Sequence, residues 1–354
     1  MRLSSHEGGG GWPGGVGGLP PGLFGGAKSM FGDGSYSGNV IQGGSVLQPV
    51  GGVLTITGDA TVAPDAVTGA CVVTCDTLVL DGAGASLKPS TNSKGLIVFA
   101  KTRIQLLNGA KINIDRLGKA GDFGNLTAWD LTPDSLKRKL NRSKLSVYVV
   151  LGEGAAGAVA RTSSGAEIGV AGSAAGSMQT GGGGSGGLYT NGNIATIGRA
   201  GKGGPCAGGA GSGAIWTDQA GWSSANAGDY GGPGGAAGGN APSPGGAGDP
   251  VGAGAAGGNP GEGAGGGLLM LFSPSISIAS GCIVSADGAK GGNGDSSAYP
   301  SGGSAGGGIM CIVTKAGGYS NLGTVRASGG DSYSAAYGRG GPGGAGSVNI
   351  FTAA

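Results

Sequence analysis

The sequence predicts an all-β protein with a body of repeated strand-turn-strand units, solenoid- or sandwich-like, a large glycine-rich insertion and one short α-helix. Three observations lead to this fold class. Short β-branched runs follow one another with no helix between them. A strand-turn-strand unit recurs along the chain. Glycine, at 90 of 354 residues, is concentrated in excursions from those units.

The β-type runs begin after Met30, and turn residues such as Asp81-Gly82 and Asn108-Gly109 separate them. They are Val53–Thr57, Cys71–Thr74, Thr77–Leu80, Leu96–Phe99, Ile104–Leu107 and Lys111–Ile114. Because strand side chains alternate between two faces, Cys71 and Cys75 share a face, and we expect two small core residues there rather than a metal site. The scattered cysteines fit synthesis in a reducing cytosol.

Residues 123–150 interrupt the β-type sequence. Thr132 is predicted as the N-cap of a short helix, with Pro133 as its first residue and Asp134 as the acid of its first turn. The basic residues of this stretch are Lys137, Arg138, Lys139, Arg142 and Lys144. Two interpretations stay open for them: a contact with an acidic surface, or a solvated helix face.

Residues 151–266 form a glycine-rich block without the strict every-third glycine of collagen. Spacing of three recurs locally, as at Gly232, Gly235 and Gly238. Polyglycine II helices, of the left-handed polyproline II type and with glycine facing inward, would pack side by side and bond to one another; a flexible linker is the alternative. We predict the ordered arrangement, because a structureless segment of this length inside a chain is uncommon.

The repeated unit starts at Gly95, Gly267 and Gly308, and a truncated copy starts at Gly346. One such unit cannot bury its face alone, so stacked neighbours must complete a shared core. We therefore expect five regions along the chain. They are an N-terminal arm (1–28), a first β region (29–122), the helix and strand insertion (123–150), the glycine-rich block (151–266) and the C-terminal β repeats (267–354).

Two sets of apolar residues are candidates for contacts with other molecules. The Gly/Pro-rich arm has spaced anchors that suit docking on a neighbouring subunit, or it is a plain tail. The glycine-rich loops carry aromatic side chains that contact a receptor or pack between glycine helices. The arm candidates are Trp12, Leu19, Leu23 and Phe24, and the receptor-contact candidates are Trp216, Trp222, Tyr230, Tyr299, Tyr333 and Tyr337.

The motifs that suggest catalysis do not hold. The glycines from Gly152 to Gly157 lack the acidic residue of a dinucleotide site. The Gly183–Gly187 stretch has no strand before it, as a nucleophile elbow needs. The one histidine, His6, leaves a catalytic triad without a base and excludes a His-rich zinc site. We expect no enzyme activity, catalytic residue, metal or cofactor, and the net charge of +2 argues against nucleic acid as the main partner.

A family resemblance rests on Phe31-Gly32-Asp33-Gly34-Ser35, on Cys75–Leu80 and on the segments GLIVFAK and LGKAGDFG. Together they resemble glycine-rich virion proteins of tailed bacteriophages, which are associated with tail fibres or tail tips. The chain is also loosely similar to T-even-type fibre-tip adhesins, whose glycine-rich segments pack as a polyglycine II sandwich that presents variable loops. Here the β body is instead split around the glycine-rich block.

The resemblance implies a non-enzymatic virion structural protein of a tail or surface appendage that displays loops for host recognition. Its partners would be other virion proteins, in a homo-oligomer or larger assembly, and a host receptor, either a glycan or an outer-membrane protein. With no signal peptide in view, we expect synthesis in the host cytoplasm and a place in the virion. Two alternatives stay open: a capsid- or tail-decorating joining protein with an inserting arm, and a β-solenoid depolymerase of surface polysaccharide.

Overall fold

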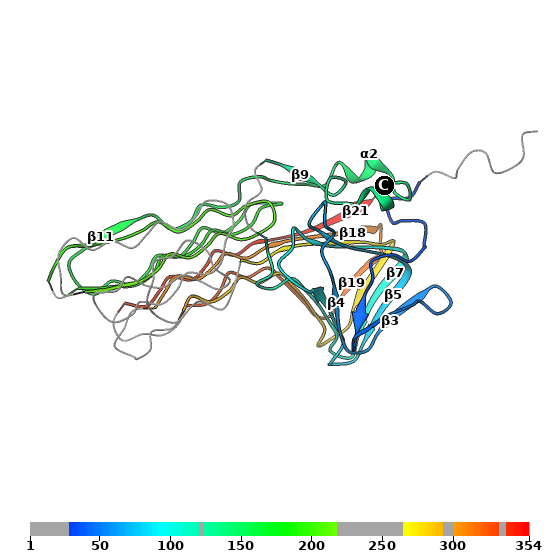
Figure 1. Cartoon of the computed structure of the whole chain (residues 1–354), viewed down its shortest axis with the longest axis horizontal. Coiled ribbons are helices and arrows are strands. Elements are labelled where there is room, and N and C mark those ends of the chain that lie inside the picture. Colours follow the sequence, from blue (N-terminus) through cyan, green and yellow to red (C-terminus); the bar gives the residue numbers. More distant parts are fainter. Residues whose placement is uncertain are drawn as a thin grey trace, which may run out of the picture.

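The structure is a computed structural model and describes residues 28–119, 124–190, 192–217, 265–292, 301–332 and 338–353. It is largely β, and the helices of the described residues are two, with four residues each. Figure 1 shows a β body at one end and a long bundle of extended segments at the other. In this part of the chain, no helix has the length and apolar character needed to cross a bilayer.

An eight-stranded sheet forms the centre of the β body, and its pairs are parallel. Its strands are β3 (Val53–Ile56), β5 (Cys71–Asp81), β7 (Leu96–Leu107), β15 (Leu268–Phe272), β16 (Ser275–Ile278), β18 (Ile309–Lys315), β19 (Tyr319–Asn321) and β21 (Ser347–Ala353). The strands β3, β5, β7, β15, β18 and β21 lie side by side in chain order.

A seven-stranded sheet packs against the first and mixes parallel with antiparallel pairs. It contains β1 (Ile41–Gln42), β2 (Ser45–Val46), β4 (Asp59–Val62), β6 (Ser86–Pro89), β8 (Lys111–Asn113), β17 (Ile283–Ser285) and β20 (Thr324–Arg326). Each repeated unit thus places its first strand in one sheet and its last strand in the other. In the unit of β7 and β8, the turn between them has left-handed φ angles of 53° at Asn108 and 82° at Gly109, as an Asn-Gly turn allows.

The register between units agrees with the repeat read from the sequence at several interfaces. Ile309 lies opposite Ser347, each directly after the first glycine of its unit. Lys111 likewise lies opposite Ile283, two residues after the second glycine. Between β7 and β15 the register differs by one residue from the repeat, since Leu96, the first residue after Gly95, lies opposite Leu269, the second residue after Gly267.

The main core lies between the two sheets, and the eight-stranded sheet is buried on both faces at β15, at β18 and in the first halves of β5 and β7. Cys71 and Cys75 are 0% and 1% exposed and belong to the inter-sheet core, which confirms their predicted role. On the outer face, Phe99 and Phe272 stack with ring centroids 4.9 Å apart. Residues 126–150 cover this face. Burial on both sides explains why the strands read as continuous apolar runs rather than alternating ones.

The predicted single helix is wrong in number, because the covering segment forms two helices. They are α1 (Asp134–Lys137) and α2 (Arg142–Leu145), and β9 (Leu126–Thr127) pairs with β10 (Val149–Val150) on either side of them. The side chain of Asn141 accepts a hydrogen bond from the backbone N–H of Lys144 at 3.2 Å. This cap starts a second helix one turn after the first ends.

The predicted cap at Thr132 is also wrong. Its hydroxyl donates to the carbonyl oxygen of Ala128 at 2.8 Å, so it closes the preceding turn instead of capping α1. Pro133 takes the N-cap position with φ −58° and ψ 144°, and no side chain caps the helix. The local turn therefore competes successfully for the threonine hydroxyl.

The second part of the molecule, the glycine bundle, consists of extended segments that lie alongside one another (Figure 1). Its described residues are 151–190, 192–217, 265–267, 286–292, 301–308, 327–332 and 338–346. Segments from the glycine-rich block and from the C-terminal repeats bond to one another: Gly181 donates to Gly307 and Gly344 donates to Gly182. The bundle thus joins parts of the chain that are far apart in sequence.

Residues 180–188, the central segment, bond to six neighbouring segments with a period of three residues. Gly181, Gly184 and Gly187 all donate to residues 301–307, and all accept from residues 209–215. The residues between them bond to other neighbours in turn. Gly182 and Ser185 donate to residues 173 and 170, respectively, and accept from residues 344 and 341. Gly183 donates to residue 201 and accepts from residue 158, and Thr180 accepts from residue 155. Successive residues of the central segment therefore bond to different neighbouring segments, whereas a strand inside a sheet bonds to two.

Close packing, and not a left-handed backbone, requires glycine in this segment. At Gly183 an added Cβ would lie under 3.0 Å from three backbone atoms, which are O and C of Ala210 and N of Gly211. Real Cβ atoms essentially never approach so closely, and backbone atoms cannot rotate away as a side chain can. The φ angle of Gly183 lies outside the left-handed region.

A ladder of polar side chains joins successive units where the seven-stranded sheet meets the glycine bundle. Asp115 accepts from the backbone N–H of Asp287 and from the Ser285 hydroxyl, both at 2.7 Å. Asp287 in turn accepts from the backbone N–H of Ser328 at 2.8 Å and from Nε of Arg326 at 2.7 Å. Burial raises the pKa of Asp115, while these hydrogen bonds oppose the shift. The ladder fixes the register of three units.

Candidate functional site

Two interruptions of the described chain, 293–300 and 333–337, begin and end at the end of the bundle away from the body, and a third, 218–264, begins there and ends beside the β body, where Gly118 donates to Gly265. There Gly187 donates to Ser301 at 2.9 Å and accepts from Ile215 at 3.0 Å, and Ser301 donates to Gly338 at 3.1 Å. Gly302 donates to Gly292 at 3.0 Å. The residue before 218–264 and the residues flanking 293–300 and 333–337 therefore lie together, and we call this part of the bundle the far end.

Short strand pairs and a small apolar core stabilise the far end. The strands are β11 (Arg161–Ser163), antiparallel to β13 (Ala195–Ile197), and β12 (Leu188–Thr190), parallel to β14 (Ile215–Thr217). The core consists of Leu188, Ala195, Ile197 and Ile215. Because glycine segments have no side chains to pack, this apolar cluster adds hydrophobic contacts to a bundle held mainly by backbone hydrogen bonds.

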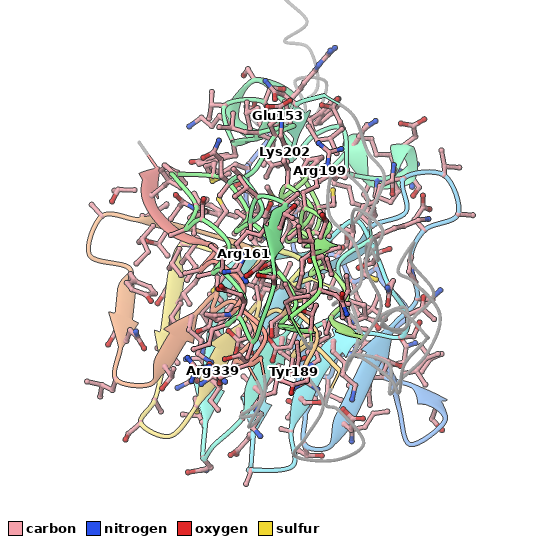
Figure 2. All side chains as sticks on the ribbon, turned by 90° about the vertical axis from the view of Figure 1, so that its left-hand side faces the viewer. Glu153, Arg161, Tyr189, Arg199, Lys202 and Arg339 are labelled. Carbon is pink, nitrogen blue, oxygen red and sulfur yellow. The ribbon has the colours of Figure 1, made fainter. Side chains whose placement is uncertain are left out.

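Polar and aromatic side chains also lie at the far end. Arg161 forms an ion pair with Glu167 at 3.5 Å, and the Ser163 hydroxyl donates to Glu167 at 3.0 Å. Figure 2, which views the molecule from this end, shows Arg161 near the centre of the view and Tyr189 and Arg339 towards its lower edge. This surface thus combines charge, hydroxyl groups and one half-buried tyrosine, the side-chain types suited to polar ligands.

Sequence reasoning omitted Tyr189. It lies in β12 directly opposite Trp216 of β14, which was among the predicted contact residues. The side chain of Trp216 is outside the described part of the structure. The one sequence signal that could have indicated Tyr189 is the glycine run directly before its short strand.

The other predicted contact residues lie outside the described residues and stay predictions. They are Trp222, Tyr230, Tyr299, Tyr333 and Tyr337 of the loops, and Trp12, Leu19, Leu23 and Phe24 of the arm. Trp222 and Tyr230 belong to 218–264, Tyr299 to 293–300, and Tyr333 and Tyr337 to 333–337. The described flanks of 293–300 and 333–337, and the residue that precedes 218–264, are at the far end.

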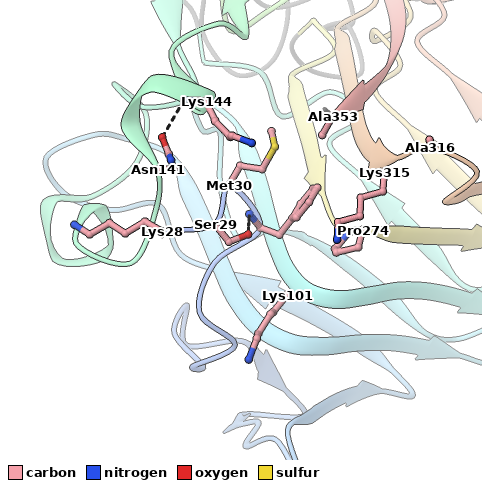
Figure 3. Close-up of a pocket in the computed structure, with 11 residues that line it drawn as sticks. Lys28, Ser29, Met30, Lys101, Asn141, Lys144, Pro274, Lys315, Ala316 and Ala353 are labelled. Atoms are coloured by element: carbon pink, nitrogen blue, oxygen red, sulfur yellow. Dashed lines mark hydrogen bonds between the residues drawn. The ribbon is translucent and has the colours of Figure 1, made fainter. Parts of the chain in front are cut away.

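At the opposite end of the molecule, a hollow of about 630 Å³ opens beside α2 (Figure 3). Its lining includes four exposed lysines from different elements, which are Lys28, Lys101, Lys144 and Lys315. Met30 contributes to the floor and is only 5% exposed. Lys28 and Ala353, which are the first and last described residues, both line this hollow.

Another hollow has three aspartates in its lining, Asp65, Asp130 and Asp134, together with Lys94 and Lys137. Hydrogen bonds from Thr68 lower the pKa of Asp65, and the Thr127 hydroxyl lowers the pKa of Asp130. Asp134 forms an ion pair with Lys137 at 2.8 Å. The general acid of a glycosidase has a raised pKa, the opposite of the shift at Asp65 and Asp130.

Within the described residues, no group of three or more metal-ligating side chains comes together. Comparisons with protein-family models, with curated proteins and with solved structures find no match to this chain.

Proposed function

We propose that the chain is a non-enzymatic structural protein of a bacteriophage virion, part of a tail or surface appendage, which displays loops for recognition of the host surface. The single observation that carries the proposal is the gathering, at the far end, of the start of 218–264 and of both flanks of 293–300 and 333–337. A rigid scaffold with variable segments at one end is a common arrangement for binding proteins. The resemblance of residues 31–35 to phage virion proteins favours the same role.

We further infer that the glycine bundle consists of polyglycine II helices and that the β body is a short solenoid of stacked units. A period of three residues and hydrogen bonds to six neighbours support the first inference. Parallel pairing of successive units in chain order supports the second. Such a bundle would hold the far end at a fixed distance from the body.

Competition with phage adsorption tests the proposed function. The purified full chain should bind host cells and reduce adsorption of the phage that encodes it. The double variant Trp222→Ala/Tyr230→Ala should lose this competition. Leu322→Ala is the matched control, because Leu322 is an apolar residue of the body that is 76% exposed. Competition that is absent from the wild-type protein, or equal in all three proteins, would refute host recognition by these loops.

A further inference from the structure

The hollow at the body end is part of a continuous surface that combines lysines with apolar atoms. The hollow of Figure 3 shares Lys28 and Asn141 with a second hollow that adds Arg142. A smaller one shares Met30 and Lys144 with it. We call these three adjoining hollows the docking surface. It lies across the molecule from the far end of the glycine bundle (Figure 1).

Charge is strongly segregated on this surface. The whole chain has 21 Lys and Arg against 19 Asp and Glu, so a random sample of its charged groups would be nearly balanced. None of the eleven residues that line the main hollow is acidic, whereas four of them are lysines. These four lysines come from the start of the described chain, from β7, from α2 and from the end of β18, so folding alone brings them together.

The apolar atoms of the docking surface form a recessed floor. Met30 and Phe31 are each 5% exposed, and Pro274 and Ala316 complete the wall beside Lys315. Figure 3 shows Lys101, Lys144 and Lys315 on different sides of Met30. A recessed apolar floor with a cationic rim suits a side chain inserted from a partner whose flanking residues are anionic.

We propose that the docking surface binds an acidic protein segment, with carboxylates next to an apolar anchor, supplied by the virion component that carries this protein. This inference rests on the proposed display function, since a display protein must be held at the end opposite its loops. Charge complementarity specifies carboxylates, and the recessed floor specifies the apolar anchor. A membrane surface fits less well, because insertion into lipid needs apolar side chains that project rather than a hollow.

Binding of a synthetic peptide tests the proposal. The probe is a fluorescein-labelled peptide of Glu and Leu residues, and its control replaces every Glu with Gln. We expect fluorescence anisotropy to show binding of the Glu peptide to the full chain, which weakens as salt screens the exposed lysines. We expect Lys101→Glu/Lys315→Glu to weaken this binding by about tenfold or more.

Lys111→Glu is the matched control, because Lys111 is an exposed lysine of the other sheet and lines none of these hollows. It should change the affinity by less than about twofold. If the reversal of two charges prevents folding, as a thermal melt would show, Lys101→Gln/Lys315→Gln removes the charges instead and should still weaken binding. Equal affinity in wild-type and double variant, or equal affinity for the Glu and Gln peptides, would overturn the proposal. Binding to phosphatidylglycerol vesicles without binding to the peptide would also overturn it.

The adsorption assay separates this inference from the proposed function. The Lys101→Glu/Lys315→Glu variant should compete for host cells as well as the wild-type chain does. Lysine-dependent peptide binding by a chain that never binds cells would refute the display role and leave the docking surface in place. Cell binding without peptide binding would refute the docking surface and leave the display role in place.

Discussion

Replacement of Gly183 by alanine is expected to force residues 207–215 away from the central segment. The new Cβ would lie under 3.0 Å from O and C of Ala210 and from N of Gly211. Separating these two segments by about 1 Å or more would relieve the clash. It would also break two buried hydrogen bonds between them, from Gly209 to Gly181 at 2.8 Å and from Ser212 to Gly184 at 3.1 Å.

The expected loss of stability follows from those two hydrogen bonds. Each buried polar pair left unmade costs about 1–3 kcal/mol, so two cost about 2–6 kcal/mol. The lower entropy of the unfolded chain with alanine returns about 0.4–1 kcal/mol. The net destabilisation of the bundle by Gly183→Ala is therefore about 2–5 kcal/mol. We expect it to be local first, because the β body has its own core.

Hydrogen exchange measured by mass spectrometry, together with thermal melts, provides the assay. In Gly183→Ala, amides of residues 181–188 and 207–215 should exchange faster, whereas β5 and β7 should keep their protection. Gly165→Ala is the matched control: it lies in the same bundle, an added Cβ meets nothing within 4 Å, and its φ is not left-handed. If both variants melt alike and exchange alike, close backbone packing is not what requires glycine in the central segment.

Three further predictions concern buried polar groups. Asp287→Ala should destabilise the chain by about 1–3 kcal/mol in urea denaturation because the bonds to Arg326 and Ser328 are lost, and equal destabilisation by Ala at the exposed Asp331 would contradict the ladder. Burial raises the pKa of Asp115, so its contribution to stability is complete below about pH 3.9, its unfolded pKa, and is lost as pH rises through the folded value. Asp115→Asn should therefore gain stability relative to wild type between pH 4 and 7. A difference in unfolding free energy between the two proteins that stays constant with pH would refute this. Burial raises the pKa of Cys311, so this thiol should react with a disulfide reagent only after denaturant is added, and rapid reaction of the native protein would count against it.

Much of the β body could be predicted from local sequence because its units repeat. The glycines that begin the copies at Gly308 and Gly346 place Ile309 opposite Ser347, as the repeat implied. The apolar runs also identified the core that holds Cys71 and Cys75. The predicted helix cap was wrong because the Thr132 hydroxyl had two partners within reach. It donates to the carbonyl oxygen of Ala128 and does not bond to the helix N-terminus. A local pattern cannot rank such competing partners.

The two candidate surfaces could be predicted from the sequence only in small part. The four lysines of the docking surface are 28, 101, 144 and 315 in the chain, with no pattern that connects them. Tyr189 lies beside Trp216 only because β12 pairs with β14 in the folded chain. Both surfaces depend on contacts between segments far apart in sequence, which composition and periodicity do not contain.

The sequence by itself determined the strand-turn-strand unit, its repetition and the high glycine content outside it, because these follow from side-chain size, β propensity and turn chemistry. Only the tertiary structure decided which segments surround residues 180–188 and which residues lie at either end of the molecule. The physical reason is that a glycine backbone carries no side chain to specify its neighbour. Its partners are selected by hydrogen bonds and close contacts that exist only once all the segments are assembled.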